Sequence, residues 1–164
     1  MIVLIEGPDG AGKTTLCNEL MRLDKFYYIH LNKVDNIEDF YKKFIKDIKR
    51  FKKHNLNLII DRAYISNIIY SKVYGGEALK ESTILKIKKY IDKTIVCLPS
   101  NKQKYLEEFE KLKKVRKEEY NSMEEIYVGF SNYLKDNKDV FVHDRLKTEI
   151  KDLKEILKKE VLLK

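Results

Sequence analysis

The sequence predicts an α/β fold in which helices cover both faces of a central five-stranded parallel sheet. Short apolar, β-prone runs alternate along the chain with longer segments whose apolar residues recur at helical spacing. The first run, residues 2–5, is apolar without interruption, as expected of a strand buried on both faces of a sheet. Because strands and helices alternate, the crossovers should be right-handed and the strands parallel.

The individual elements follow from these patterns in order. Strands are predicted at residues 2–5, 26–29, 56–60, 94–98 and 140–142. Helices are predicted at residues 13–23, 35–53, 64–73 and 81–91, then as two charged helices after the fourth strand, and as an apolar-striped helix at residues 150–161. Helix starts are placed by three capping-box patterns, which are Asp35 with Glu38, Ser100 with Gln103, and Ser122 with Glu125.

Length and composition indicate a single globular domain spanning residues 1–164. The chain has 164 residues, of which 43% are hydrophobic and 37% charged. No apolar run approaches the roughly 20 residues that span a bilayer, and the first five residues are too short for a signal peptide. We therefore expect a cytoplasmic protein without a membrane partner. Cys17 and Cys97 lack CxxC spacing and are expected to be buried free thiols.

The charge of the chain favours anionic ligands without identifying them. The net charge of +8 should attract ATP and nucleic acid alike. Most basic residues are lysines interleaved with glutamates on predicted helix faces, which is typical of a solvated surface. Nucleic acid is therefore an alternative partner that we do not favour.

A glycine-rich loop follows the first strand. Residues 7–14, GPDGAGKT, satisfy GxxxxGK[ST] between a predicted strand and a predicted helix, which is the context of a phosphate-binding P-loop. Its glycines leave backbone N–H groups pointing at a dense anion, and the following helix adds its positive end. We expect catalytic Lys13 to reach the β and γ phosphates of ATP, and Thr14 to ligate Mg²⁺. The fold is thus predicted to be a P-loop NTPase three-layer sandwich, with ATP bound by Gly7, Asp9, Gly10, Ala11, Gly12, Lys13, Thr14 and Thr15.

A charged pair follows the third predicted strand. The carboxyl ends of parallel strands share one edge of the sheet, so Asp61 and Arg62 should lie beside the P-loop. Asp61 is predicted to hold the water shell of Mg²⁺ and Arg62 to grip an acceptor phosphate in line with the donor. A surface ion pair is the alternative for both residues.

Two segments resemble thymidylate kinases. Residues 2–16, IVLIEGPDGAGKTTL, are similar to the opening of that family, including the acidic residue before the first glycine and the Asp inside the loop. Residues 61–76 resemble its second motif, an Asp-Arg pair followed by serine, tyrosine and glycines, although Ala63 and Ser71 replace the usual Tyr and Gln. The resemblance implies that Asp9 takes the 3′-hydroxyl of the acceptor sugar, with a turn-stabilising Asp as the alternative. Tyr70 is the best candidate for a further acceptor contact.

The same resemblance implies a helical lid at about residues 100–120. Arg116, followed by Lys117 and Glu118, resembles the lid's Arg-x-Glu. Relatives without a basic residue in the P-loop supply it from the lid, and here that position is Gly10. Arg116 is therefore a candidate catalytic residue, and an arginine in this role contributes roughly 10³-fold or more to the rate. A solvated charged helix is the alternative.

The region expected to bind the acceptor departs from the family. The Arg-Glu-Pro type segment after the second strand is absent, and residues 30–33 read HLNK instead. The helical excursion before the third strand is also short. Phe40, Tyr41 and Phe44 could stack a base, but an aromatic stripe at helical spacing is more often core. For His30 we favour a strand-capping role over an acceptor contact.

Three functions remain open on the sequence. The first is a deoxynucleoside monophosphate kinase that uses ATP and Mg²⁺ to make a diphosphate from a dTMP-like acceptor. The second is a deoxynucleoside kinase, or a kinase acting on a hydroxymethylated base in DNA. The third is a non-catalytic P-loop switch, because residues 32–35 match NKxD, the pattern that GTPases use to read guanine. In GTPases this motif follows a late strand, whereas here it follows the second predicted strand, so we treat the match as chance. A homodimer is implied by the resemblance alone.

Overall fold

The computed structural model describes residues 1–31, 36–113, 117–145 and 147. Its elements, in chain order, are β1 Ile2–Glu6, α1 Lys13–Leu23, β2 Phe26–His30, α2 Ile37–Lys53, β3 Asn57–Asp61, α3 Tyr64–Tyr74, α4 Glu81–Lys88, β4 Lys93–Cys97, α5 Lys102–Lys113, α6 Lys117–Asp136 and β5 Phe141–His143. The predicted helix at residues 150–161 lies outside the described part of the chain.

The five strands form one parallel sheet with the order β2-β3-β1-β4-β5. This confirms the predicted sheet. The strand β1 lies at its centre, hydrogen-bonded to β3 and β4, and all five of its residues are buried. Ile5 pairs with Asp61, and Glu6 pairs with Val96, so the carboxyl ends of the three central strands meet at one edge.

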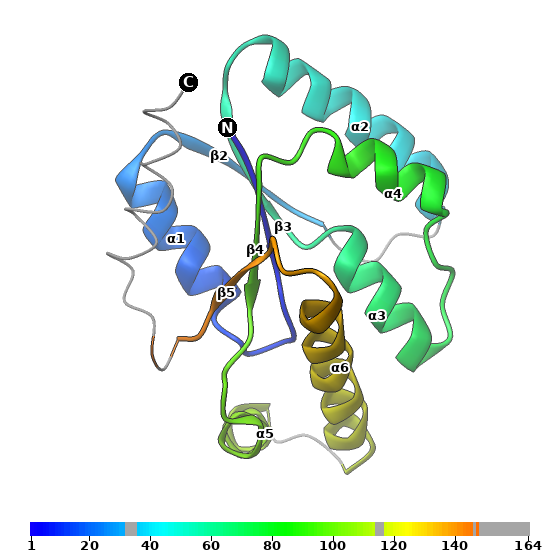
Figure 1. Ribbon diagram of the computed structural model, residues 1–164. Helices are drawn as coiled ribbons and strands as arrows, with labels where there is room; N and C mark the ends of the chain where they lie inside the picture. The colour runs from blue at the N-terminus through cyan, green and yellow to red at the C-terminus, as the bar shows by residue number, and fades with distance from the viewer. Residues whose placement is uncertain (32–35, 114–116, 146, 148–164) are drawn as a thin grey trace.

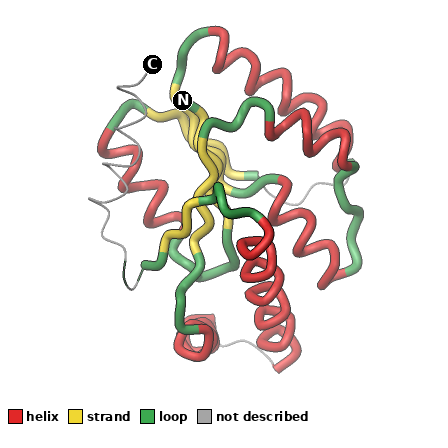
Figure 2. Tube along the Cα trace, viewed as in Figure 1, coloured by secondary structure: helices red, strands yellow, loops and turns green. Residues whose placement is uncertain are grey.

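Helices cover both faces of the sheet, as predicted. Figure 1 shows the sheet nearly edge-on, with α1 on one side and α2, α3, α4 and α6 on the other. The helix α5 lies below the carboxyl ends of the strands, near the loop that joins β1 to α1. The tube in Figure 2 shows the same three layers, with the yellow strands between two layers of red helices. This arrangement is the fold class that the sequence predicted.

One predicted helix start is wrong, and two are displaced by one residue. The cap of α5 is Asn101, whose side chain accepts a hydrogen bond from the Lys104 N–H at 2.9 Å, instead of Ser100. Ser122 opens no helix, because it lies inside α6 and its hydroxyl donates to the Glu118 carbonyl at 3.0 Å. Asp35 lies outside the described residues, and Asn36 caps α2 by accepting from the Asp39 N–H. In each case a competing polar residue or a longer helix satisfies the same local pattern.

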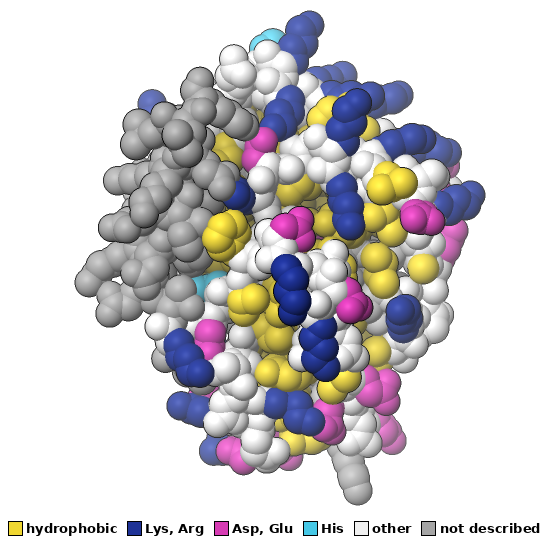
Figure 3. Space-filling view, viewed as in Figure 1, with side chains coloured by type: hydrophobic (Ala, Val, Ile, Leu, Met, Phe, Trp, Pro, Cys, Tyr) yellow, Lys and Arg dark blue, Asp and Glu magenta, His cyan; other side chains and the backbone are white. Residues whose placement is uncertain are grey.

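The interior is apolar and the surface is charged. Cys17 and Cys97 are buried free thiols, as predicted, and burial raises the pKa of Cys97 to about 12. Lys and Arg gather over the upper part of the face in Figure 3, where α2 and α4 lie, and mix with Asp and Glu around α6. Such mixing is typical of a solvated surface. Among the described helices, none combines the length and apolarity needed to cross a bilayer.

Candidate active site

The P-loop begins where β1 ends and closes at the start of α1. Gly7, Gly10 and Gly12 all adopt positive φ, and α1 begins at Lys13. The Lys13 ammonium is buried and donates to the Pro8 carbonyl across the loop at 2.8 Å. Burial lowers the pKa of Lys13, and the nearby Arg62 charge acts in the same direction. An anion bound in the loop would offset both effects.

Gly7 is required by the close approach of β4. Its φ is +140°, and a Cβ at this position would overlap the carbonyl oxygen of Cys97. We expect Gly7→Ala to destabilise the protein by about 2 kcal/mol or more, because neither backbone can yield without breaking sheet pairing. Gly75→Ala is the matched control: φ is +68° there, open space surrounds the glycine, and the expected loss is about 1 kcal/mol. Urea unfolding measures both, and equal losses would contradict the proposed clash.

Arg62 joins the end of β3 to the P-loop. Its backbone N–H donates to the Ile5 carbonyl at 2.9 Å, and its φ of 70° turns the side chain out of the strand direction. The guanidinium forms an ion pair with the Asp9 carboxylate and lies over the Tyr70 ring, 4.9 Å from the ring centroid. The structure therefore brings together three residues that were predicted to contact the acceptor.

Asp61 is buried and only partly satisfied. One carboxylate oxygen, Oδ2, accepts from the Tyr28 hydroxyl at 2.8 Å and lies 3.0 Å from His30 Nδ1. His30 and Asp61 are paired in the β2–β3 register, which places both side chains at the carboxyl edge. The other oxygen, Oδ1, has no partner among the described residues. His30 therefore contacts Asp61 in the cavity, a role beyond the strand capping that the sequence favoured.

Glu6 is a positioning residue that sequence reasoning did not identify. Its carboxylate is fully buried at the start of α3 and accepts from the N–H groups of Ala63, Ile65 and Ser66 at 2.8, 3.1 and 3.2 Å. The Ser66 hydroxyl donates to it as well. Burial raises the pKa of Glu6, whereas these hydrogen bonds act in the opposite direction. The only sequence signal was an acidic residue before the first glycine.

The helix α5 contacts the P-loop at Asp9 and Gly10. The Tyr105 hydroxyl donates to the Asp9 carbonyl at 2.5 Å, and the Phe109 ring is within 3.4 Å of a Cβ placed on Gly10. This helix falls within the predicted lid at residues 100–120. Arg116, the predicted transition-state cation, lies outside the described residues. Its role remains a prediction.

A cavity of about 660 Å³ lies at the carboxyl edge of the sheet, lined by residues of the P-loop, of the start of α1 and of the ends of β2, β3 and β5. Its lining includes two residues without any sequence signal, His143 and Arg145, at the end of β5 and just beyond it. His143 is buried, and its Nδ1 has no partner in the described part of the chain. The full lining is Asp9, Gly10, Gly12, Lys13, Thr14, Thr15, Leu16, His30, Asp61, Arg62, His143 and Arg145.

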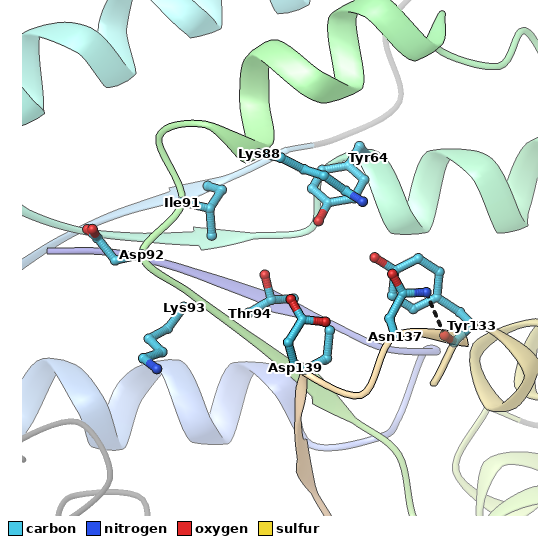
Figure 4. Close-up of a pocket in the computed structure, with 10 residues that line it drawn as sticks. Tyr64, Lys88, Ile91, Asp92, Lys93, Thr94, Tyr133, Asn137 and Asp139 are labelled. Atoms are coloured by element: carbon cyan, nitrogen blue, oxygen red, sulfur yellow. Dashed lines mark hydrogen bonds between the residues drawn. The ribbon is translucent and has the colours of Figure 1, made fainter. Parts of the chain in front are cut away.

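A second, smaller cavity of about 290 Å³ lies near the amino end of β4 (Figure 4). Tyr64, Thr94 and Tyr133 contribute hydroxyl groups to it, and the Asn137 amide donates to the Tyr133 carbonyl at 2.8 Å. The described residues that line it include neither the P-loop nor the Asp61-Arg62 pair. The larger cavity is therefore the candidate active site.

The fold and the phosphate loop define this chain as a P-loop protein with the fold of nucleoside and nucleotide kinases. YorR protein from Bacillus subtilis, solved with phosphorylated GDP, superposes with a TM-score of 0.76 at 17% identity over 99% of this chain and 96% of that one. Deoxyadenosine kinase from M. mycoides with bound dCTP gives 0.59 at 19% identity over the whole of both chains. Thymidylate kinase from Candida albicans gives 0.60 at 15% identity, covering 97% and 91%. These identities establish the fold alone.

In sequence, the chain is similar to a protein of Acidianus bottle-shaped virus (isolate Italy/Pozzuoli) named "Putative thymidylate kinase". The two are 38% identical over 77 residues, which are 45% of this chain and 49% of the viral protein. The match thus spans about half the length of that relative. No model of a known protein family matches the chain.

Proposed function

We propose that the protein transfers the γ-phosphoryl group of Mg-ATP to a deoxynucleoside monophosphate of the dTMP type, forming the diphosphate. The observation that supports this most is that P-loop residues, Asp61 and Arg62 line the same cavity. Phosphoryl transfer depends on positioning two anionic reactants in line and stabilising spread negative charge. Lys13 and Arg62 line one cavity, so two cations are available there to position the two anionic reactants and to stabilise the negative charge.

The residues at the end of β3 fit a magnesium ion. Asp61 has a buried carboxylate oxygen without a partner among the described residues, and the exposed Thr14 lines the same cavity. Mg²⁺ keeps several waters and takes one or two protein oxygens in addition to substrate phosphates, so this pair is a sufficient donor set. When bound, the ion neutralises charge that develops on the β and γ phosphates. Tyr28 and His30 keep the aspartate oriented toward the cavity.

Asp9, Arg62 and Tyr70 are the proposed acceptor site. An arginine fork suits a phosphate because it donates two parallel hydrogen bonds. The Asp9 carboxylate that now pairs with Arg62 would accept from a hydroxyl of the acceptor sugar when the phosphate takes the guanidinium. The Tyr70 ring limits the rotation of Arg62 by packing against it. This division of roles gives a neutral sugar and an anionic phosphate separate partners.

The decisive experiment is a coupled ADP-release assay with ATP and Mg²⁺. The acceptors are a panel of deoxynucleoside monophosphates, deoxynucleosides and hydroxymethylated DNA. Turnover with monophosphates alone is the expected result. Turnover with nucleosides or DNA alone would replace the proposal by the second function, and absence of acceptor-dependent turnover would indicate a non-catalytic switch.

Arg62→Ala tests the acceptor assignment. We expect the acceptor KM to rise about 10- to 100-fold, because a charge-assisted hydrogen bond contributes about 1.5–3 kcal/mol, while the KM for ATP changes little. Arg62→Lys keeps the charge but loses the fork, so it should recover only part of the loss. Arg22→Ala, an exposed arginine of α1 paired with Glu19, is the matched control. Initial-rate kinetics with each substrate varied separately give both constants, and an unchanged acceptor KM would exclude a bound monophosphate.

A further inference from the structure

Arg145 is not part of the P-loop, but its cationic side chain packs against the loop. This residue follows β5 and lines the same cavity as Lys13, Thr14 and Thr15. Its aliphatic stem packs on the last glycine of the loop, since a Cβ placed on Gly12 would lie 3.2 Å from the Arg145 Cδ and 3.6 Å from its Cβ. Gly12 immediately precedes α1, so the stem crosses the positive end of that helix.

Glu108 on α5 holds the other end of this side chain. The Arg145 Nη2 group forms an ion pair with the Glu108 carboxylate, and the two side chains are 31% and 32% exposed. Tyr105 and Phe109, on the same face of α5, contact the loop at Asp9 and Gly10. One helix face therefore both covers the P-loop and anchors the guanidinium. A guanidinium carries five N–H donors, more than one carboxylate uses.

We propose that Arg145 binds the polyphosphate of the donor nucleotide and that Glu108 is the residue that positions it. The location selects this ligand: a cation held over the last glycine of a P-loop faces the place where the loop and the helix end bind phosphate. Among the described cations that line the cavity, Lys13 follows Gly12 directly in the sequence, and Arg145 packs on Gly12. The inference rests on the proposed function only in taking a nucleoside triphosphate as the P-loop ligand.

Calorimetric titration of the full chain with Mg-ADP, and separately with magnesium tripolyphosphate, tests this without requiring turnover. Arg145→Met keeps the stem over Gly12 and removes the charge, so we expect both affinities to fall about 10- to 30-fold, in keeping with a charge-assisted hydrogen bond. Lys147→Met, an exposed lysine two residues further on, is the matched control and should bind both ligands as the wild type does. A loss seen with ADP but not with tripolyphosphate would place the guanidinium at the base and overturn the proposal.

Glu108→Gln tests the positioning role. We expect a smaller loss of Mg-ADP affinity than for Arg145→Met, and no additional loss when both substitutions are combined, because Glu108 acts through Arg145. Additive losses would show that Glu108 acts independently, which would contradict this role. If the wild type binds no nucleotide, the proposed function itself fails; if the wild type binds and Arg145→Met binds equally well, only the Arg145 assignment fails.

Discussion

Lys13→Met should lower kcat for phosphoryl transfer by about 10²- to 10³-fold or more with every acceptor. The lysine is the cation of the P-loop, and a preorganised charge aimed at a developing anion in a water-poor site is usually worth about 10²- to 10³-fold or more. Lys13 is buried inside the loop and already oriented by the Pro8 carbonyl. Methionine keeps the length of the stem while removing the charge.

The same substitution should not unfold the protein. The pKa of Lys13 is lowered by burial and by Arg62, which means that folding favours the neutral amine and that the charge costs stability at neutral pH. Lys13→Met should therefore leave the melting temperature unchanged or raise it slightly. Lys25→Met, an exposed lysine before β2, is the matched control for activity. Residual turnover above about one tenth of the wild-type rate would show that the loop is not the catalytic phosphate site.

Glu6→Ala should lower the free energy of unfolding by at least about 3 kcal/mol, since an unsatisfied buried polar group costs about 1–3 kcal/mol. The substitution leaves three backbone N–H groups at the start of α3 and the Ser66 hydroxyl without their acceptor. It also removes the link that fixes α3 to the end of β1, and with it the position of Arg62. We therefore expect the acceptor KM to rise together with the loss of stability.

Denaturant unfolding at several urea concentrations measures this effect, and two further variants define its cause. Glu6→Gln keeps the shape and one acceptor oxygen, so its loss should be intermediate. Glu19→Ala removes a partly exposed surface carboxylate paired with Arg22 on α1 and should change stability by less than about 0.5 kcal/mol. A Glu6→Ala protein as stable as the Glu19→Ala protein would rule out the capping role.

Local patterns were sufficient for most of the fold. Short sequence patterns were enough to predict the P-loop, the buried strand β1 and the start of α1. The reason is that a buried strand and a glycine-rich turn each depend on residues only a few positions apart. The helix caps show the limit of such patterns. Ser100 and Asn101 both satisfy a capping signal, and only the folded chain shows that Asn101 accepts the bond.

In the candidate site, too, the sequence predicted some residues, and only the structure showed the others. The sequence identified Lys13, Asp61 and Arg62 because a motif and the rule that ligands bind at strand ends place them together. It could not identify what holds them. Glu6 caps a helix that begins 58 residues later, His30 reaches Asp61 through the register of β2 and β3, and no pattern links Glu108 to Arg145.

The sequence by itself therefore determined the class of fold and the phosphate loop of this protein, since both depend on short-range periodicity and on residue types at fixed spacing. Only the tertiary structure decided which side chains orient the loop, the aspartate and the two arginines. Those partners come from strands and helices far apart in the chain. Their contacts depend on sheet order, register and helix packing, which many sequences satisfy with different residues.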